Sequence, residues 1–209
     1  MFTGCSNTES FVQADLIYTQ SDIGTISVPN DVQVVGLGEA SHGVSQYHQM
    51  KADVFKALVE NNGCRTFIIE GDFGGALKVD RYINGGSGSA EEVVAEIGFA
   101  IYRTQEMVDL VDWMRSYNET VSQEESLHFY GMDVQRFDNN KEYLFSVIEQ
   151  THPELGAEYS EIIAQLTDEQ RTSLDETTLH SAKESISEFI DKLDAVETDI
   201  VESLGQPAF

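Results

Sequence analysis

Basic residues are scarce in this 209-residue chain, which has 12 lysines and arginines against 37 aspartates and glutamates, a net charge of −25 at pH 7. Nucleic-acid binding needs clustered basic side chains that neutralise phosphates, and the sequence contains no such cluster. We therefore exclude nucleic acid as a partner. The acidic residues are spread along the chain, which predicts an acidic, solvated surface of the halophilic kind. Such a surface favours folding in salt that screens its self-repulsion.

Cysteines and long apolar runs are also scarce. No apolar stretch is long enough to cross a membrane as a helix, so the sequence predicts no membrane span. The two cysteines, Cys5 and Cys64, form no disulfide or zinc framework. Cys5 lies in a segment that is similar to the end of a lipoprotein signal, although the charged and apolar regions of a signal are missing upstream. Two localisations stay open: cytoplasmic as the sequence stands, or exported with a lipid anchor at Cys5 if the true start lies upstream.

The most informative stretch is VQVVGLGEASHG, residues 32–43. Its apolar run predicts a buried strand, and the glycines that follow predict a sharp turn. The turn would place Glu39 and His42 at the carboxyl edge of a sheet, where open α/β sheets bind ligands. Histidine transfers protons near neutral pH, and a nearby carboxylate orients it and raises its basicity. The alternative is that Glu39 caps a helix and His42 is an ordinary loop residue.

Two further apolar runs end in acidic residues. RTFIIEG contains Glu70, and LHFYGMD ends at Asp133. Helical patterns separate the three runs, which predicts parallel strands joined by right-handed crossovers, with a helix over residues 46–61 covering the sheet. Because parallel strands have their carboxyl ends at one edge, we expect Glu39, His42, Glu70 and Asp133 to converge there.

The predicted fold class is α/β, with a small parallel sheet and flanking helices followed by an all-helical C-terminal segment. We expect a polar leader over residues 1–20, an α/β core over 21–150 and the helical segment over 151–209. No convincing strand pattern follows Asp133. Three strands make a small sheet, since most have about 4–6, so we interpret the chain as an incomplete domain.

Several separated motifs resemble the erythromycin esterase family: GLGEASHG (36–43), KADVFKALVENNGCRTFIIEG (51–71), DRYINGG (80–86), YRTQEMVDLVDWMRSYN (102–118) and HFYGMDVQ (128–135). The resemblance implies an α/β fold and hydrolysis of a macrolactone or a related small-molecule ester, without a metal or other cofactor. His42 matches the general base of the family, Glu39 and Glu70 match the acids around it, and Arg103 matches a site-facing arginine. Members of the family continue into a second half with another histidine motif, which this sequence lacks.

These observations predict a hydrolase in which His42 takes a proton from the water that attacks an ester carbonyl. Arg103, Asp133 and His48 are the predicted substrate-binding residues, with Arg103 stabilising the developing oxyanion. No serine stands in a G-x-S-x-G turn, which disfavours an acyl-enzyme route. Two alternatives stay open. The first is a metal-dependent hydrolase, and the second is a truncated or non-catalytic domain that binds a ligand. The ligands of such a metal would be Glu39, His42, Glu70 and Asp133.

Overall fold

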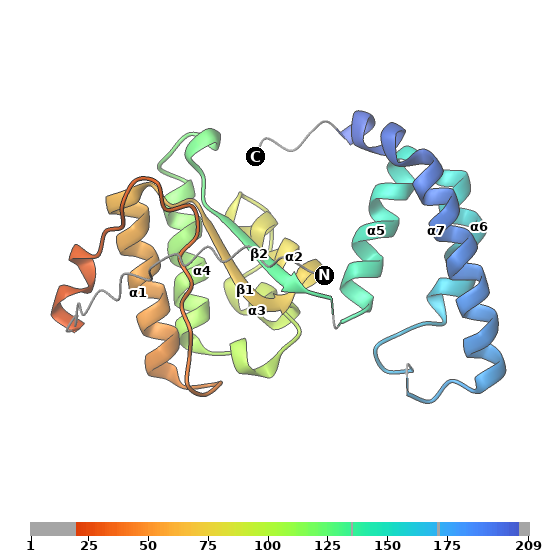
Figure 1. Cartoon of the computed structure of the whole chain (residues 1–209), viewed down its shortest axis with the longest axis horizontal. Coiled ribbons are helices and arrows are strands. Elements are labelled where there is room, and N and C mark those ends of the chain that lie inside the picture. The colour runs from red at the N-terminus through yellow and green to blue at the C-terminus, as the bar shows by residue number, and fades with distance from the viewer. Residues whose placement is uncertain (1–19, 135, 171, 205–209) are drawn as a thin grey trace, which may run out of the picture.

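The computed structural model of the chain describes residues 20–134, 136–170 and 172–204. Almost all of the predicted polar leader, including Cys5, lies outside the described residues. The described chain has the predicted class, a small parallel sheet with flanking helices followed by a helical segment (Figure 1). The helices are α1 (Ser45–Asn62), α2 (Phe73–Ile83), α3 (Ala90–Glu96), α4 (Gln105–Asn118), α5 (Asp138–Thr151), α6 (Pro153–Ala164) and α7 (Glu176–Leu204). Short 3₁₀ turns occupy Gln20–Thr25, Ala100–Tyr102 and Gln123–Glu125.

The sheet has two strands in the described part of the chain, β1 (Thr66–Asp72) and β2 (His128–Asp133). They pair in parallel, with Thr66 opposite His128 and Ile69 opposite Gly131. The crossover between them contains α2, α3 and α4, as the sequence predicted for these two strands. Phe67 and Ile69 of β1 are buried, whereas the alternating residues between and beside them are exposed. The sheet is therefore buried on one face along β1, although parallel sheets are usually covered on both.

The strand predicted for the apolar run that begins residues 32–43 does not form, so that prediction was wrong. Residues 28–38, which we call the strap, contain a turn at residues 30–31 and otherwise pass β1 and α1 without regular secondary structure. Side chains on both alternating faces of the strap are exposed, and Val34 reaches 84 % exposure. A strand is stabilised by ladder hydrogen bonds and by side chains packed on its neighbours. The strap lacks both because a cavity separates it from the sheet.

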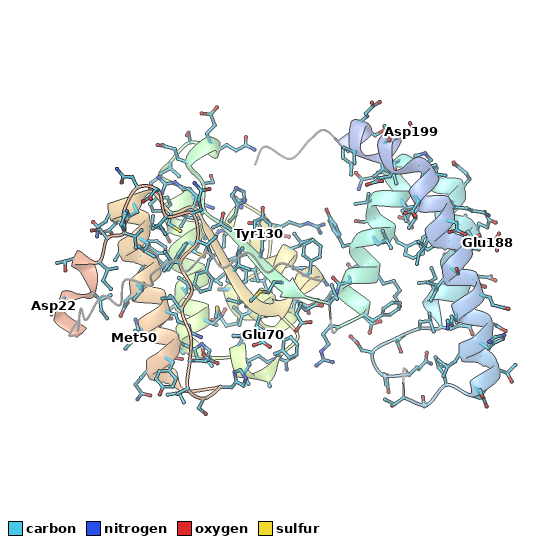
Figure 2. The ribbon with its side chains drawn as sticks, viewed as in Figure 1. Asp22, Met50, Glu70, Tyr130, Glu188 and Asp199 are labelled. Carbon is cyan, nitrogen blue, oxygen red and sulfur yellow. The ribbon has the colours of Figure 1, made fainter. Side chains whose placement is uncertain are left out.

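Helix α1 was predicted within one residue at each end. Gly63 ends it with a positive φ of 68°, a left-handed conformation in which glycine has no steric penalty. Its buried face packs on the sheet through Phe55, whose ring centroid lies 5.0 Å from that of Phe67. Met50, by contrast, is exposed and lies on the side of α1 away from the sheet (Figure 2).

Helix α2 is fixed to its neighbours by one fully buried carboxylate. Asp72 accepts a hydrogen bond from Gly75 N at 2.8 Å and so caps the helix. Its other oxygen accepts from the side chain of Asn140 on α5, at 2.6 Å. This pair of contacts ties the α/β part of the chain to the first helix of the C-terminal segment.

The helical segment has a separate apolar core. Helices α5, α6 and α7 enclose Ile148, Leu155, Tyr159, Ile163 and Phe189. Glu188 and Asp199 lie exposed on α7, consistent with the predicted acidic surface (Figure 2). Among the described residues, no helix is long and apolar enough to cross a membrane.

Candidate functional site

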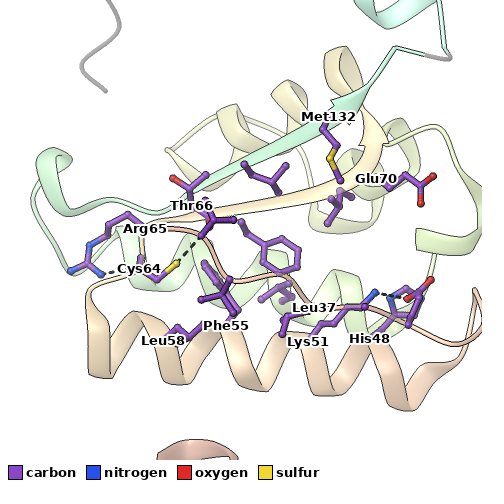
Figure 3. Close-up of a pocket in the computed structure, with 18 of the residues that line it drawn as sticks. Leu37, His48, Lys51, Phe55, Leu58, Cys64, Arg65, Thr66, Glu70 and Met132 are labelled. Carbon is purple, nitrogen blue, oxygen red and sulfur yellow. Dashed lines mark hydrogen bonds and ion pairs between the residues drawn. The ribbon is translucent and has the colours of Figure 1, made fainter. Parts of the chain in front are cut away.

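A cavity of about 800 Å³ lies between α1, β1 and the strap (Figure 3). His48, Lys51 and Glu70 lie at one end of it, and Cys64 and Arg65 lie at the other. Between the ends the wall is mostly apolar and includes Leu37, Phe55, Leu58, Phe67 and Leu110. A mostly apolar cleft of this size with a few polar groups at one place is typical of small-molecule sites.

Glu39 and His42 form a hydrogen-bonded pair at the polar end of the cavity. The distance between His42 Nδ1 and Glu39 Oε1 is 2.6 Å. The left-handed Gly43, with φ 71°, follows directly and turns the chain toward α1. The His42 side chain is 59 % exposed, whereas that of Glu39 is only 12 % exposed. The imidazole is thus open to water and held from the protein side by a carboxylate.

A third residue, Lys51, contacts this pair, and the sequence analysis did not predict Lys51 as a site residue. Its ammonium donates a hydrogen bond to the second carboxylate oxygen, Oε2, of Glu39. The hydrogen bond from Lys51, and then the one with His42, hold the pKa of the Glu39 carboxyl below its ordinary value. Glu39 is therefore ionised at neutral pH. A signal was available in the sequence, since Lys51 lies three residues after His48 and faces the same side of a helix.

His48 and Tyr102 form the inner wall beside the pair. His48 is only 4 % exposed, and its Nε2 has no hydrogen-bond partner in the described structure. Its ring lies edge-on to Tyr102, with 5.9 Å between centroids. Burial, and then the charges of Glu39 and Glu70, raise the pKa of the Tyr102 phenol to about 12. Tyr102 is therefore a neutral hydrogen-bond donor at physiological pH.

Besides Glu39 and Glu70, a carboxylate from α4, that of Glu106, reaches this end of the cavity. Glu106 accepts a hydrogen bond from the Ser45 hydroxyl at the start of α1. That contact is the largest cause that holds the pKa of Glu106 below its ordinary value. The polar end therefore has a negative charge on more than one side, with Lys51 as the nearby cation on α1.

The structure brings together four of the six predicted site residues. Glu39, His42, His48 and Glu70 all line the cavity. Arg103 is exposed, does not line it, and donates a hydrogen bond to the Ala95 carbonyl at 3.2 Å. Asp133 also stays outside the lining, half-buried at the end of β2, because Met132 occupies the cavity side of that strand. Within the described ranges, no group of three or more histidine, cysteine or acidic side chains is arranged to hold a metal ion.

The fold and the site define an α/β protein in which an ionised carboxylate pairs with an imidazole beside a mostly apolar cleft. Comparison with known sequences narrows this class. The sequence profile of the erythromycin esterase family matches residues 59–208, and the chain belongs to that family. The match includes Glu70, but it begins after Glu39 and His42, so the placement of those two residues is an observation from the structure.

Individual proteins are similar to part of this chain. The chain is 28 % identical over 114 residues to an erythromycin esterase type II from Escherichia coli, covering 54 % of this chain and 26 % of that protein. It is similar to a solved Bacillus cereus structure, with a TM-score of 0.65 and 25 % identity over 78 % of this chain and 40 % of that one. A solved succinoglycan biosynthesis protein gives a TM-score of 0.64 and 25 % identity, covering 80 % of this chain and 43 % of that one. The chain thus spans about a quarter of the curated relative and about two fifths of the solved ones.

Proposed function

We propose that this protein hydrolyses carboxylic esters, with His42 as the general base that activates water. The single observation that carries the proposal is the contact between His42 Nδ1 and Glu39 Oε1 at 2.6 Å, beside a cleft that suits a small molecule. With Nδ1 engaged by a carboxylate, the other ring nitrogen is the one that accepts a proton. Membership of the erythromycin esterase family supports a hydrolase.

The proposed reaction has two proton transfers, both through His42. Water attacks the ester carbonyl and transfers a proton to His42, while Glu39 stabilises the imidazolium that forms. The tetrahedral oxyanion then collapses, and His42 returns the proton to the departing alkoxide. The products are a carboxylic acid and an alcohol, and His42 is regenerated.

Tyr102 is better placed than Arg103 to contact the oxyanion. The phenol lines the cavity and stays neutral, so it can donate a hydrogen bond without losing its proton. Arg103 already donates to a backbone carbonyl outside the cavity. We assign Lys51 to the orientation of Glu39, since its ammonium contacts that carboxylate.

A panel of carboxylic esters, including a macrolactone, tests the proposal in molar salt. His42→Ala is expected to lower kcat/KM by 10²-fold or more, because general acid–base catalysis contributes about 10²–10⁴-fold. His180→Ala is the matched control, since His180 is exposed on α7 and pairs with Glu184 at 3.5 Å. Circular dichroism checks that both variants fold. Near-normal turnover by His42→Ala would refute the assignment.

Two further outcomes separate this proposal from its alternatives. Activity that chelators abolish and a divalent ion restores would favour the metal-dependent hydrolase. Ligand binding without turnover of any ester would favour a binding protein. The cavity itself supports that second candidate, because its volume and apolar wall suit a ligand whether or not chemistry follows.

A further inference from the structure

The cavity follows one face of α1, and its course along the helix has consequences for its occupant. One face of α1 lines it through His48, Lys51, Phe55, Leu58 and Asn62. The first and last of these residues lie 14 steps apart along the helix, which corresponds to about 21 Å. The cavity therefore runs along α1, and we call this elongated space the slot.

Polar groups are concentrated at one end of this slot. His48, Lys51 and Glu70 lie there (Figure 3). Glu39 contacts Lys51 and His42, which places this pair at the same end. Lys51 and Leu58 are seven residues apart on α1, so the apolar part begins at the site and continues for at least ~10 Å. Along that length, Phe55, Leu58 and Phe67 are buried core residues that present hydrocarbon to the cavity.

Two polar side chains at the distal end, Asn62 and Arg65, are already engaged. Asn62 exchanges two hydrogen bonds with the backbone of Val28, at 3.0 and 2.7 Å, and so fastens the strap to the end of α1. The Arg65 guanidinium donates to the carbonyls of Cys64 and Val59, at 3.0 and 3.4 Å. Neither side chain is free to recognise a polar substituent, and the distal end suits a hydrocarbon terminus.

We infer that the cavity holds a linear apolar chain, and that the substrate is an ester of a medium-length alkyl acid. This inference rests on the proposed function, which places the ester carbonyl at His42. The chain would extend beneath the strap toward Leu58. An extended chain advances about 1.2 Å per bond, so about eight bonds cover the ~10 Å from Lys51 to Leu58.

A series of straight-chain 4-nitrophenyl esters, from two to twelve carbons, tests the inference on the full chain. Each methylene group buried in the slot should raise kcat/KM by up to about fourfold. The increase should level off near eight carbons, where the chain reaches Leu58. Flat values along the series, or faster turnover of a macrolactone than of the octanoate ester, would overturn the inference.

Two valine variants locate the effect in the cavity. Val32→Trp narrows the distal half of the slot from the strap, and it should lower the ratio of octanoate to acetate turnover by tenfold or more. Val134→Trp is the matched control, because Val134 is exposed and does not line the cavity. This control should leave the ratio unchanged. An equal ratio in the two variants would contradict the proposed path of the chain.

Binding of N-methyl alkanamides, whose acyl chains match those of the ester series, separates this inference from the proposed function when it is measured by calorimetry. These amides carry the same chains and are not cleaved as esters are. If no ester is hydrolysed but amide affinity rises with chain length and falls in Val32→Trp, the hydrolase proposal fails and the slot inference stands. If esters are hydrolysed but affinity is independent of length, the hydrolase proposal stands and the slot inference fails.

Discussion

At the scale of single residues, the orientation and the charge of Glu39 depend on two contacts. It contacts His42 through one oxygen and Lys51 through the other, so a single carboxylate connects the base to a cation on α1. Lys51 is also the largest cause of the lowered pKa of Glu39. Removal of that ammonium would therefore alter both the orientation and the charge of the group that holds His42.

Lys51→Met tests this dependence. Losing the cation disfavours the carboxylate form, so the pKa of Glu39 should rise toward its ordinary value. The acidic limb of the kcat/KM profile should then move to higher pH, and kcat/KM at pH 7 should fall roughly tenfold, a fraction of the general-base contribution. The measurement is a pH–rate profile on an ester that the wild type hydrolyses.

Lys56→Met is the control for this experiment. Lys56 lies on the same helix, and its ammonium is 5.3 Å from the centroid of the Trp113 ring, outside the cavity. Its loss should leave the profile in place. A Lys51→Met profile that coincides with the wild type, at normal turnover, would show that the ion pair has no role in the reaction.

At the scale of elements, helix packing depends on close backbone approach at one glycine of α2. A Cβ at Gly75 would lie only 1.9 Å from the carbonyl oxygen of Glu96, at the end of α3. The Gly75 amide is also the donor to the buried Asp72 cap. Backbone atoms on both sides fix this distance, so a side chain has no flexible neighbour to displace.

Gly75→Ala should lower the free energy of unfolding by about 3 kcal/mol, the upper part of the usual range for overpacking. Gly156→Ala on α6 is the matched helical control, because the nearest atom to its Cβ would be an ordinary 3.5 Å away. That control should stabilise the protein by about 0.5–1 kcal/mol, since alanine favours helix over glycine. Urea unfolding curves give both values, and a Gly75→Ala protein as stable as the wild type would contradict the packing described.

The elements also show what could be predicted from the sequence. Periodicity predicted α1, because this helix buries one stripe and ends at a local signal, Gly63. The strap has the residues of a strand, yet a strand needs a partner, and pairing is a property of distant segments rather than of the run itself. Glu39, His42 and Glu70 all line the cavity, whereas Asp133, which was predicted to converge with them, does not. The roles of these residues stay predictions. A parallel-strand pattern places the strand ends at one edge of the sheet, but it does not specify which side chains at those ends face the cavity.

Charge dominates at the scale of the whole molecule. The net charge of −25 favours expanded states through self-repulsion, and salt reduces that term over a distance of about 10 Å at 0.1 M and 3 Å at 1 M. Exposed acidic residues such as Glu188 and Asp199 contribute to this negative charge along α7. The halophilic character inferred from composition stays a prediction.

Thermal unfolding at pH 7 in 0.05 M and 2 M NaCl tests this prediction. The Tm should rise with salt by roughly 5–10 °C, corresponding to a few kcal/mol for a chain of this size. The same pair of measurements near pH 4.2, the isoelectric point of the sequence, is the control. There the net charge is small, and the salt effect should largely vanish. Equal Tm values in the two salts at pH 7 would show that self-repulsion does not limit stability.

The strap has a consequence for how copies of this protein behave in concentrated solution. Its VQVVGL run has high β-propensity, no proline and no charge, and its backbone is free of ladder bonds. Such a run is a template for intermolecular cross-β growth. Asp31 and Glu39 flank it as charged gatekeepers, and electrostatic repulsion between whole chains keeps the templates apart. Acidification toward the isoelectric point removes that repulsion, so fibril formation is the failure expected of this fold on storage in acid.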